Sequence, residues 1–259
     1  MTRRIDESKC IGCGECVADC VIRYIFLKET EDGKRIASFT GKGKCMECGH
    51  CNAVCPEGAI TGGERLIEPS FEPDALLKHM SEKRTVRRYK KGARVSEDAL
   101  EKIIFAAQTA PSGRNKRTVR IVFVKEGLPD VYGKAVDVLV ADAKKAGPES
   151  PMYPYIMGLD RKRDEILWDA EYLVVLSGKP DRIADAAIAA ERMQLEAANL
   201  GVGTAYRGDM RAAINNSPEL KAILGIKENE QAQICFAMGI PDVEYSRPVV
   251  KKNKTVEFM

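Results

Sequence analysis

The sequence has no long hydrophobic run. Its longest purely apolar stretches, such as Tyr172 to Leu176, are far too short to cross a bilayer, and the first ten residues lack the apolar core of a signal peptide. We therefore expect a cytoplasmic protein with no membrane-spanning segment. The net charge is also small, +3 over 259 residues, and it gives no reason to expect binding to nucleic acid or to a membrane surface.

Histidine is scarce, since the chain contains only His50 and His79. The G-x-S-x-G and H-E-x-x-H patterns are absent as well, which argues against the common serine hydrolase and zinc peptidase classes. We expect both histidines to be structural or solvent-facing, Cys235 to be an inert core thiol, and Trp168 to be a packing residue. No side chain stands out as a general acid or base, so the sequence identifies no catalytic residue.

The chain is rich in cysteine, but only near its N-terminus. Apolar residues make up 44% and charged residues 31%, which is typical of a globular protein, and the length predicts one large domain or two smaller ones. Eight of the nine cysteines, however, lie between Cys10 and Cys55. In a reducing cytosol clustered thiols usually hold metal, and disulfides are rare.

The clustered cysteines form an internal repeat. Each unit has the pattern C-x2-C-x2-C-x3-C, and the second begins 35 residues after the first. In such a run the fourth cysteine is a ligand of the other cluster. The pattern therefore predicts two [4Fe-4S] clusters with crossed ligands. The ligands of one are Cys10, Cys13, Cys16 and Cys55, and those of the other are Cys45, Cys48, Cys51 and Cys20.

This segment resembles the two-cluster bacterial ferredoxin domain over residues 1–62. Pro56 follows Cys55 as in that family, whereas Val21 follows Cys20. Structural zinc is the alternative, but zinc sites favour two well-separated C-x2-C pairs over three cysteines in succession. Between the two units, the turn at 31–34 and the Gly/Lys-rich stretch at 41–44 predict an added hairpin or loop.

A change in composition follows the cysteine repeat. Residues 63–74 are polar and contain glycines and prolines, and we interpret them as a linker to a second domain, residues 75–259. Ser96 is a suitable N-cap for a helix that ends before Pro111. Further helices are expected near 73–82 and over 183–200, and strands over 119–125, 172–176 and 231–238.

Three segments of the second domain carry groups that can hold a flavin. The run Lys83 to Tyr89 gathers cations and a hydroxyl, the loop Ala110 to Asn115 presents backbone and amide groups, and Gly201 to Thr204 permits close backbone approach. Each has an ordinary alternative: a solvated basic face, a turn and a helix C-cap respectively. The order of the three along the chain is more informative than any one of them.

In that order, followed by M-G-I-P at 238–241 and a basic tail, the segments resemble the nitroreductase family of FMN enzymes over residues 75–259. The resemblance implies that the FMN phosphate and ribityl chain are held by Lys83, Arg84, Thr85 and Arg87. It implies that the loop reaching the flavin of the partner subunit contains Pro111, Ser112 and Asn115, with Arg117 close by. It places Gly201, Gly203 and Thr204 near the ring, and Lys251 and Lys252 at the phosphate.

The resemblance also implies an α+β fold, with a mixed central sheet wrapped by helices and FMN at the interface of a homodimer. Chains that join a ferredoxin domain to a nitroreductase domain form a subgroup of the family, and the whole chain resembles them. The implied activity is an FMN-dependent oxidoreductase, fed by the clusters, that reduces nitroaromatic, quinone or similar conjugated acceptors. Arg87 and Arg117 would stabilise negative charge on the flavin.

Several points stay open at this stage. The electron donor stays open between a ferredoxin and NAD(P)H: the clusters suggest a ferredoxin or another iron–sulfur protein, and the absence of a dinucleotide-binding fingerprint does not exclude NAD(P)H. The acceptor could be another organic molecule. In an alternative interpretation, the chain is an electron-transfer module that exchanges electrons with a protein partner.

Overall fold

The computed structural model describes residues 4–20, 22–40, 45–46, 49–61, 74–160, 163–245 and 257. Contacts divide the chain into two units, residues 1–71 with 114–116, and residues 72–113 with 117–259. Apart from Asp74, the predicted linker lies outside the described residues. No helix in the described parts of the chain is long and apolar enough to cross a membrane.

The first unit repeats one small motif. A glycine in the left-handed conformation, Gly14 (φ 83°) or Gly49 (φ 82°), precedes each of the short helices α1 (Glu15–Ala18) and α2 (His50–Ala53). Each helix carries one buried cysteine, Cys16 or Cys51. The cysteine repeat in the sequence is therefore a repeat of backbone structure as well.

Four short strands frame these helices. Strand β1 (Arg4–Ile5) pairs with β4 (Ile60–Thr61), and β2 (Ile25–Glu29) pairs with β3 (Arg35–Phe39), both antiparallel. The second pair is the hairpin predicted between the two cysteine units, and it turns at residues 30–34. Its buried side chains, Ile25, Ile36 and Ala37, form a core with the cysteines.

The second unit is built on a four-stranded sheet of order β5-β6-β8-β7. Its strands are β5 (Arg120–Val124), β6 (Tyr172–Gly178), β7 (Gly203–Tyr206) and β8 (Gln231–Gly239). Its helices are α3 (Ala75–Glu82), α4 (Glu97–Gln108), α5 (Leu128–Ala146), α6 (Tyr153–Met157), α7 (Ile183–Asn199), α8 (Gly208–Asn216) and α9 (Pro218–Ile223), with 3₁₀ turns at Gly113–Asn115 and Pro180–Arg182. The ladders between these strands are antiparallel, and a parallel bridge from Thr85 to Thr204 is added outside β7. The predicted α+β class is confirmed.

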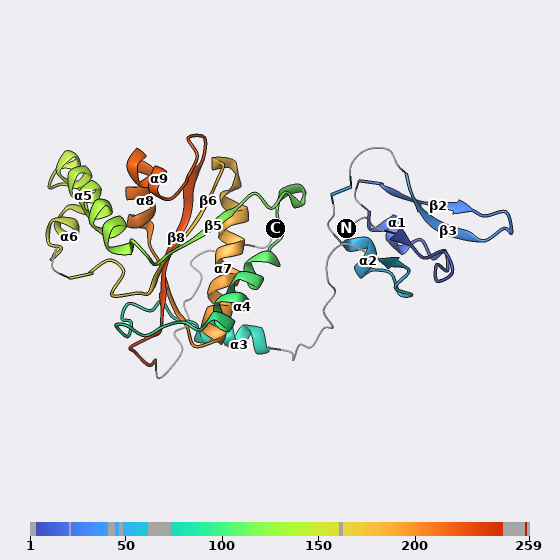
Figure 1. The fold of residues 1–259 in the computed structure, drawn as a ribbon, viewed down its shortest axis with the longest axis horizontal. Helices are drawn as coiled ribbons and strands as arrows, with labels where there is room; N and C mark the ends of the chain where they lie inside the picture. Colours follow the sequence, from blue (N-terminus) through green and yellow to red (C-terminus); the bar gives the residue numbers. More distant parts are fainter. Residues whose placement is uncertain are drawn as a thin grey trace. The chain divides into compact units, whose positions relative to one another are not determined.

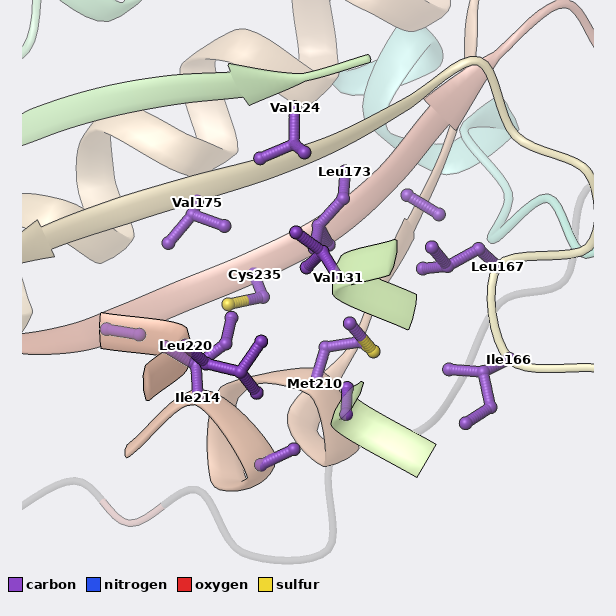
Figure 2. Close-up of a cluster of buried hydrophobic side chains, with 14 of the residues drawn as sticks. Val124, Val131, Ile166, Leu167, Leu173, Val175, Met210, Ile214, Leu220 and Cys235 are labelled. Atoms are coloured by element: carbon purple, nitrogen blue, oxygen red, sulfur yellow. The ribbon is translucent and has the colours of Figure 1, made fainter. Parts of the chain in front are cut away.

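Helices cover both faces of this sheet, which is why β6, one of its two inner strands, is buried at every position. Alternate residues of β6 point to opposite faces, as strand geometry requires. Val174 and Leu176 pack with α4 and α7, whereas Leu173 and Val175 pack with α5, α8 and α9 (Figure 1). Figure 2 shows the second of these cores, where Cys235 of β8 lies among apolar side chains.

The predicted elements of the second unit appear with small shifts at their ends. Ser96 caps α4 by accepting a hydrogen bond from the amide of Ala99 at 3.2 Å. Gly201 follows α7 with φ 72°, a conformation that glycine adopts without strain. Periodicity and capping are local signals, so they were sufficient to predict these elements.

Candidate cofactor sites

Four cysteines of the first unit line one cavity. Cys10, Cys13, Cys16 and Cys55 surround it together with Leu27, Ala37 and Ile60, and with its opening to solvent it measures about 350 Å³. Three of the cysteines come from the first repeat and the fourth from the second. This grouping is the one that the crossed assignment proposes.

A second cavity, of about 370 Å³, is lined by Cys20, Cys45 and Cys51. Here one cysteine comes from the first repeat and two from the second. The remaining proposed ligand, Cys48, lies outside the described residues. His50 also lines this cavity, next to Cys51 on α2.

The cysteines suit a cluster better than a single metal ion. Zinc would draw four sulfurs to about 2.3 Å from one point. Among the described residues, no three Cys, His, Asp or Glu side chains are placed to hold one ion. The thiols instead stand around the walls of two cavities, as ligands of a larger, multi-iron group would.

The electrostatics of the first cavity agree with this assignment. Burial, followed by the nearby Cys10, Cys13 and Cys55, raises the pKa of the Cys16 thiol to about 11. Thiolates so close to one another repel, and cationic iron at the centre of the cavity would offset that repulsion. The donor set therefore fits an iron–sulfur cluster.

Backbone amides face three of these sulfurs. The amide of Ala37 lies 3.3 Å from Cys10 Sγ, that of Ala59 3.3 Å from Cys55 Sγ, and that of Tyr24 3.2 Å from Cys20 Sγ. Hydrogen bonds to ligand sulfurs orient the ligands and stabilise negative charge on a cluster.

In the second unit, two of the predicted flavin-binding segments lie side by side. The amide of Val86 donates to the carbonyl oxygen of Thr204 at 2.9 Å, and Thr85 and Thr204 form a parallel bridge. A Cβ atom on Gly203 would lie 2.8 Å from Val86 Cβ. Gly203 therefore permits close packing of β7 against the segment 83–87. These two segments are more than 100 residues apart in the sequence but adjacent in the structure.

Two buried donors next to this junction lack acceptors. Arg84 Nε has no hydrogen-bond partner, although its two Nη atoms donate to the carbonyl oxygens of Lys83 and Ser81. Gln194, on α7, accepts from Thr204 Oγ1 at 3.0 Å, and its amide lies near the Tyr206 hydroxyl, but its Nε2 makes no hydrogen bond of normal geometry. Buried donors are rarely left without acceptors in proteins. A ligand rich in acceptor atoms, such as FMN, suits this place.

An acidic side chain lies among the predicted phosphate ligands. Lys83 Nζ lies 3.1 Å from Glu191 Oε1, and the Tyr206 hydroxyl donates to Glu191 Oε2 at 3.3 Å. Burial and then the Glu191 carboxylate raise the pKa of Tyr206. Lys83 therefore carries a counter-ion within the protein, whereas Thr85 and Arg87 are exposed.

Gly113 of the predicted loop at 110–117 contacts the first turn of α7. The amide of Gly113 donates to Asp185 Oδ1 at 3.2 Å, and that of Arg117 donates to Ser112 Oγ at 3.0 Å. With 1.5 Å of rise per residue, Asp185 is roughly 9–14 Å along the helix axis from Glu191 and Gln194. Gly113 therefore lies about two to three helical turns away from the residues of α7 that contact Lys83 and Thr204.

Other predicted contacts are placed elsewhere or not described. Pro111 is exposed. Asn115 Nδ2 donates to the carbonyl oxygen of Met46 at 2.9 Å, and residues 114–116 group with the first unit. Lys251 and Lys252 lie outside the described residues.

Sequence reasoning missed two polar groups of this unit. Gln194 and Glu191 are three residues apart on α7, so they face the same side, and a glutamine on an Ala-rich helix face was the available signal. The second group is the ion pair of Arg207 with Asp209, in which both side chains are only 9% exposed. The Arg207 guanidinium lies 4.4 Å from the centre of the Trp168 ring. Trp168 is a packing residue, as expected, and its ring packs against the Arg207 guanidinium.

Comparison with known proteins gives the same two parts. A family model described as "Nitroreductase family" matches residues 80–240, and one described as "4Fe-4S dicluster domain" matches residues 9–62. A ferredoxin from Pyrobaculum islandicum is 39% identical over 57 residues, which are 22% of this chain. The chain spans about half, 49%, of the length of that curated relative.

Solved structures resemble the second unit. A nitroreductase with bound FMN from Bacteroides fragilis has a TM-score of 0.60 at 22% identity, over 71% of this chain and 99% of that one. A nitroreductase with bound FMN from Desulfitobacterium hafniense has a TM-score of 0.58 at 23% identity, over 71% and 97%. At these identities the likeness concerns the fold.

Proposed function

The chain belongs to the nitroreductase family and carries a 4Fe-4S dicluster domain, and from this premise we propose that it reduces a small conjugated acceptor with electrons from its own clusters. Membership of that family makes it an FMN-dependent oxidoreductase, and the dicluster domain supplies its iron–sulfur clusters. Nitroaromatics and quinones are the acceptor class that we propose. One observation carries the proposal: a single chain joins two cysteine-lined cavities to a flavoenzyme fold.

The two types of cofactor supply different chemistry. The clusters transfer single electrons, and FMN uses two such electrons to reduce an organic molecule. The cysteines of the two cavities hold the clusters. Arg84, Thr85 and Arg87 hold the phosphate and ribityl chain, and the unpaired Gln194 amide donates to the flavin from α7. Gly201 and Thr204 bring the backbone near the ring, whereas Gly203 lets the segment 83–87 pack against β7.

We propose that the protein acts as a homodimer. Large apolar side chains of α3, α4 and α7 are exposed, among them Leu77 (65%), Met80 (48%) and Phe105 (48%). A second copy would cover these side chains. It would also allow the loop at 110–117, whose Gly113 contacts the first turn of α7 rather than the part with Glu191 and Gln194, to serve the partner's flavin. Light scattering of the purified protein should give twice the chain mass of 28.6 kDa.

Anaerobic steady-state assays with a panel of nitroaromatics and quinones test the proposed acceptors. Turnover well above that of free FMN supports the proposal. Turnover no greater than that of free FMN would contradict it and would favour an electron-transfer module with a protein partner.

Replacement of cluster ligands tests the electron path. Cys10→Ala or Cys45→Ala should abolish flavin reduction by a reduced ferredoxin and leave reduction by NAD(P)H intact. Cys235→Ala is the matched control, because this buried thiol belongs to the core of the second unit. Equal loss of both electron inputs in the ligand variants would show that the clusters only maintain the fold.

A further inference from the structure

The hairpin of β2 and β3 covers the cavity of Cys10, Cys13, Cys16 and Cys55. Leu27 of β2 and Ala37 of β3 line this cavity, and Ala37 is 3% exposed. The hairpin therefore forms part of the wall around the first proposed cluster, although none of its residues is a ligand.

The amide of Ala37 points at a ligand sulfur. Its nitrogen lies 3.3 Å from Cys10 Sγ, within the distance of an N–H···S hydrogen bond. Ala37 stands opposite Leu27 in the antiparallel ladder. Since this N–H is directed at the sulfur, it is not part of the ladder between the two strands.

A glycine allows the hairpin to come so close. Gly12, between Cys10 and Cys13, has φ 68°, and a Cβ atom there would lie 2.3 Å from the carbonyl oxygen of Arg35 on β3. No side chain fits in that space. The absence of a side chain at Gly12 therefore lets the loop that carries the ligands pack directly against the strand that carries the Ala37 amide.

We propose that this hairpin sets the reduction potential of the cluster on Cys10, Cys13, Cys16 and Cys55, with the Ala37 amide as the positioned donor. The inference rests on the proposed function only in assuming that these cysteines hold a cluster. Reduction adds one negative charge, and an N–H donor at a ligand sulfur stabilises the more negative state. The amide therefore raises the potential and makes this cluster easier to reduce.

Removal of the amide hydrogen tests the proposal directly. Lactic acid in place of Ala37 keeps the methyl group and replaces N–H by oxygen, and Ala37→Pro removes the same hydrogen with natural amino acids. An EPR-monitored redox titration of the full-length holoprotein should show a lower potential for one cluster only. We expect about a tenfold lower ratio of reduced to oxidised cluster at fixed potential, which is 59 mV for one electron.

Gly12→Ala provides a second variant, since its Cβ forces β3 away from Cys10 Sγ. Gly33→Ala is its matched control, because Gly33 lies in the same hairpin with φ 79° and no atom within 4 Å of an added Cβ. We expect a lower potential for Gly12→Ala and an unchanged one for Gly33→Ala. A higher potential for Gly12→Ala would mean that water access outweighs the amide, and would overturn the proposal.

Iron analysis separates this inference from the proposed function. About eight irons per chain, as two four-iron clusters require, must be present in the wild type. Wild-type protein without iron would refute the proposed function. Variants that keep both clusters but show unchanged potentials would refute only the role of the hairpin.

Discussion

Gly203→Ala is expected to separate the two segments that we assign to FMN. An added Cβ would lie 2.8–2.9 Å from three carbon atoms of Val86, which is closer than carbon atoms pack. Val86 cannot easily retreat. Its amide donates to Thr204, its carbonyl accepts from the Tyr89 hydroxyl at 3.0 Å, and its side chain is 5% exposed.

The expected cost follows from these constraints. Overfilling a packed site typically destabilises by about 1–3 kcal/mol. For a unit of this size, that lowers the melting temperature by about 2–4 °C per kcal/mol. Displacement of Thr85 and Arg87 should also weaken FMN binding, and a loss of about 1.4 kcal/mol there is tenfold in Kd.

Thermal unfolding and flavin fluorescence titration measure the two effects. Gly133→Ala is the control, because Gly133 lies inside α5 with no atom within 4 Å of an added Cβ, and it should stabilise by about 0.5–1 kcal/mol. Val86→Ala combined with Gly203→Ala should be less destabilised than the sum of the single changes by at least about 0.5 kcal/mol. Additive effects would show that the two residues do not press on each other, and would refute the reasoning.

Three further predictions concern other polar or buried groups. Glu191→Gln frees the Lys83 ammonium and should tighten FMN binding about fivefold, since an ion pair with one solvent-exposed partner is worth about 1 kcal/mol; weaker binding would show that the carboxylate positions Lys83. Arg207→Lys loses the two-point contact with Asp209 and should lower unfolding free energy by about 2–4 kcal/mol in thermal melts, whereas an unchanged melting temperature would contradict this. Burial raises the pKa of the Cys235 thiol, so iodoacetamide at pH 8 should label it only after denaturation with urea; peptide mass spectrometry detecting label in the native holoprotein would contradict its burial.

The spacing of the cysteines made the iron–sulfur site predictable. Residues two or three apart in the chain stay close in any fold, so local sequence alone states which thiols can act together. The crossing of Cys20 and Cys55 to opposite groups also follows from the pattern. By contrast, no local signal pointed to the amide of Ala37, because it reaches Cys10 across 27 positions of chain.

In the second unit, periodicity and caps act over short distances, so they predicted α3, α4, α7, β5, β6 and β8, but α5, α6, α8, α9 and β7 were not predicted. The class of cofactor came from the resemblance to the nitroreductase family. Tertiary structure alone decided that Val86 needs Gly203 to be a glycine, that Lys83 is paired with Glu191, and that Gln194 keeps a free donor beside Thr204. Each of these pairs two elements that meet only when α7, β7 and the segment 83–87 are packed together. A sequence pattern does not specify distances between residues that are far apart in the chain, because these distances are set only when the core packs.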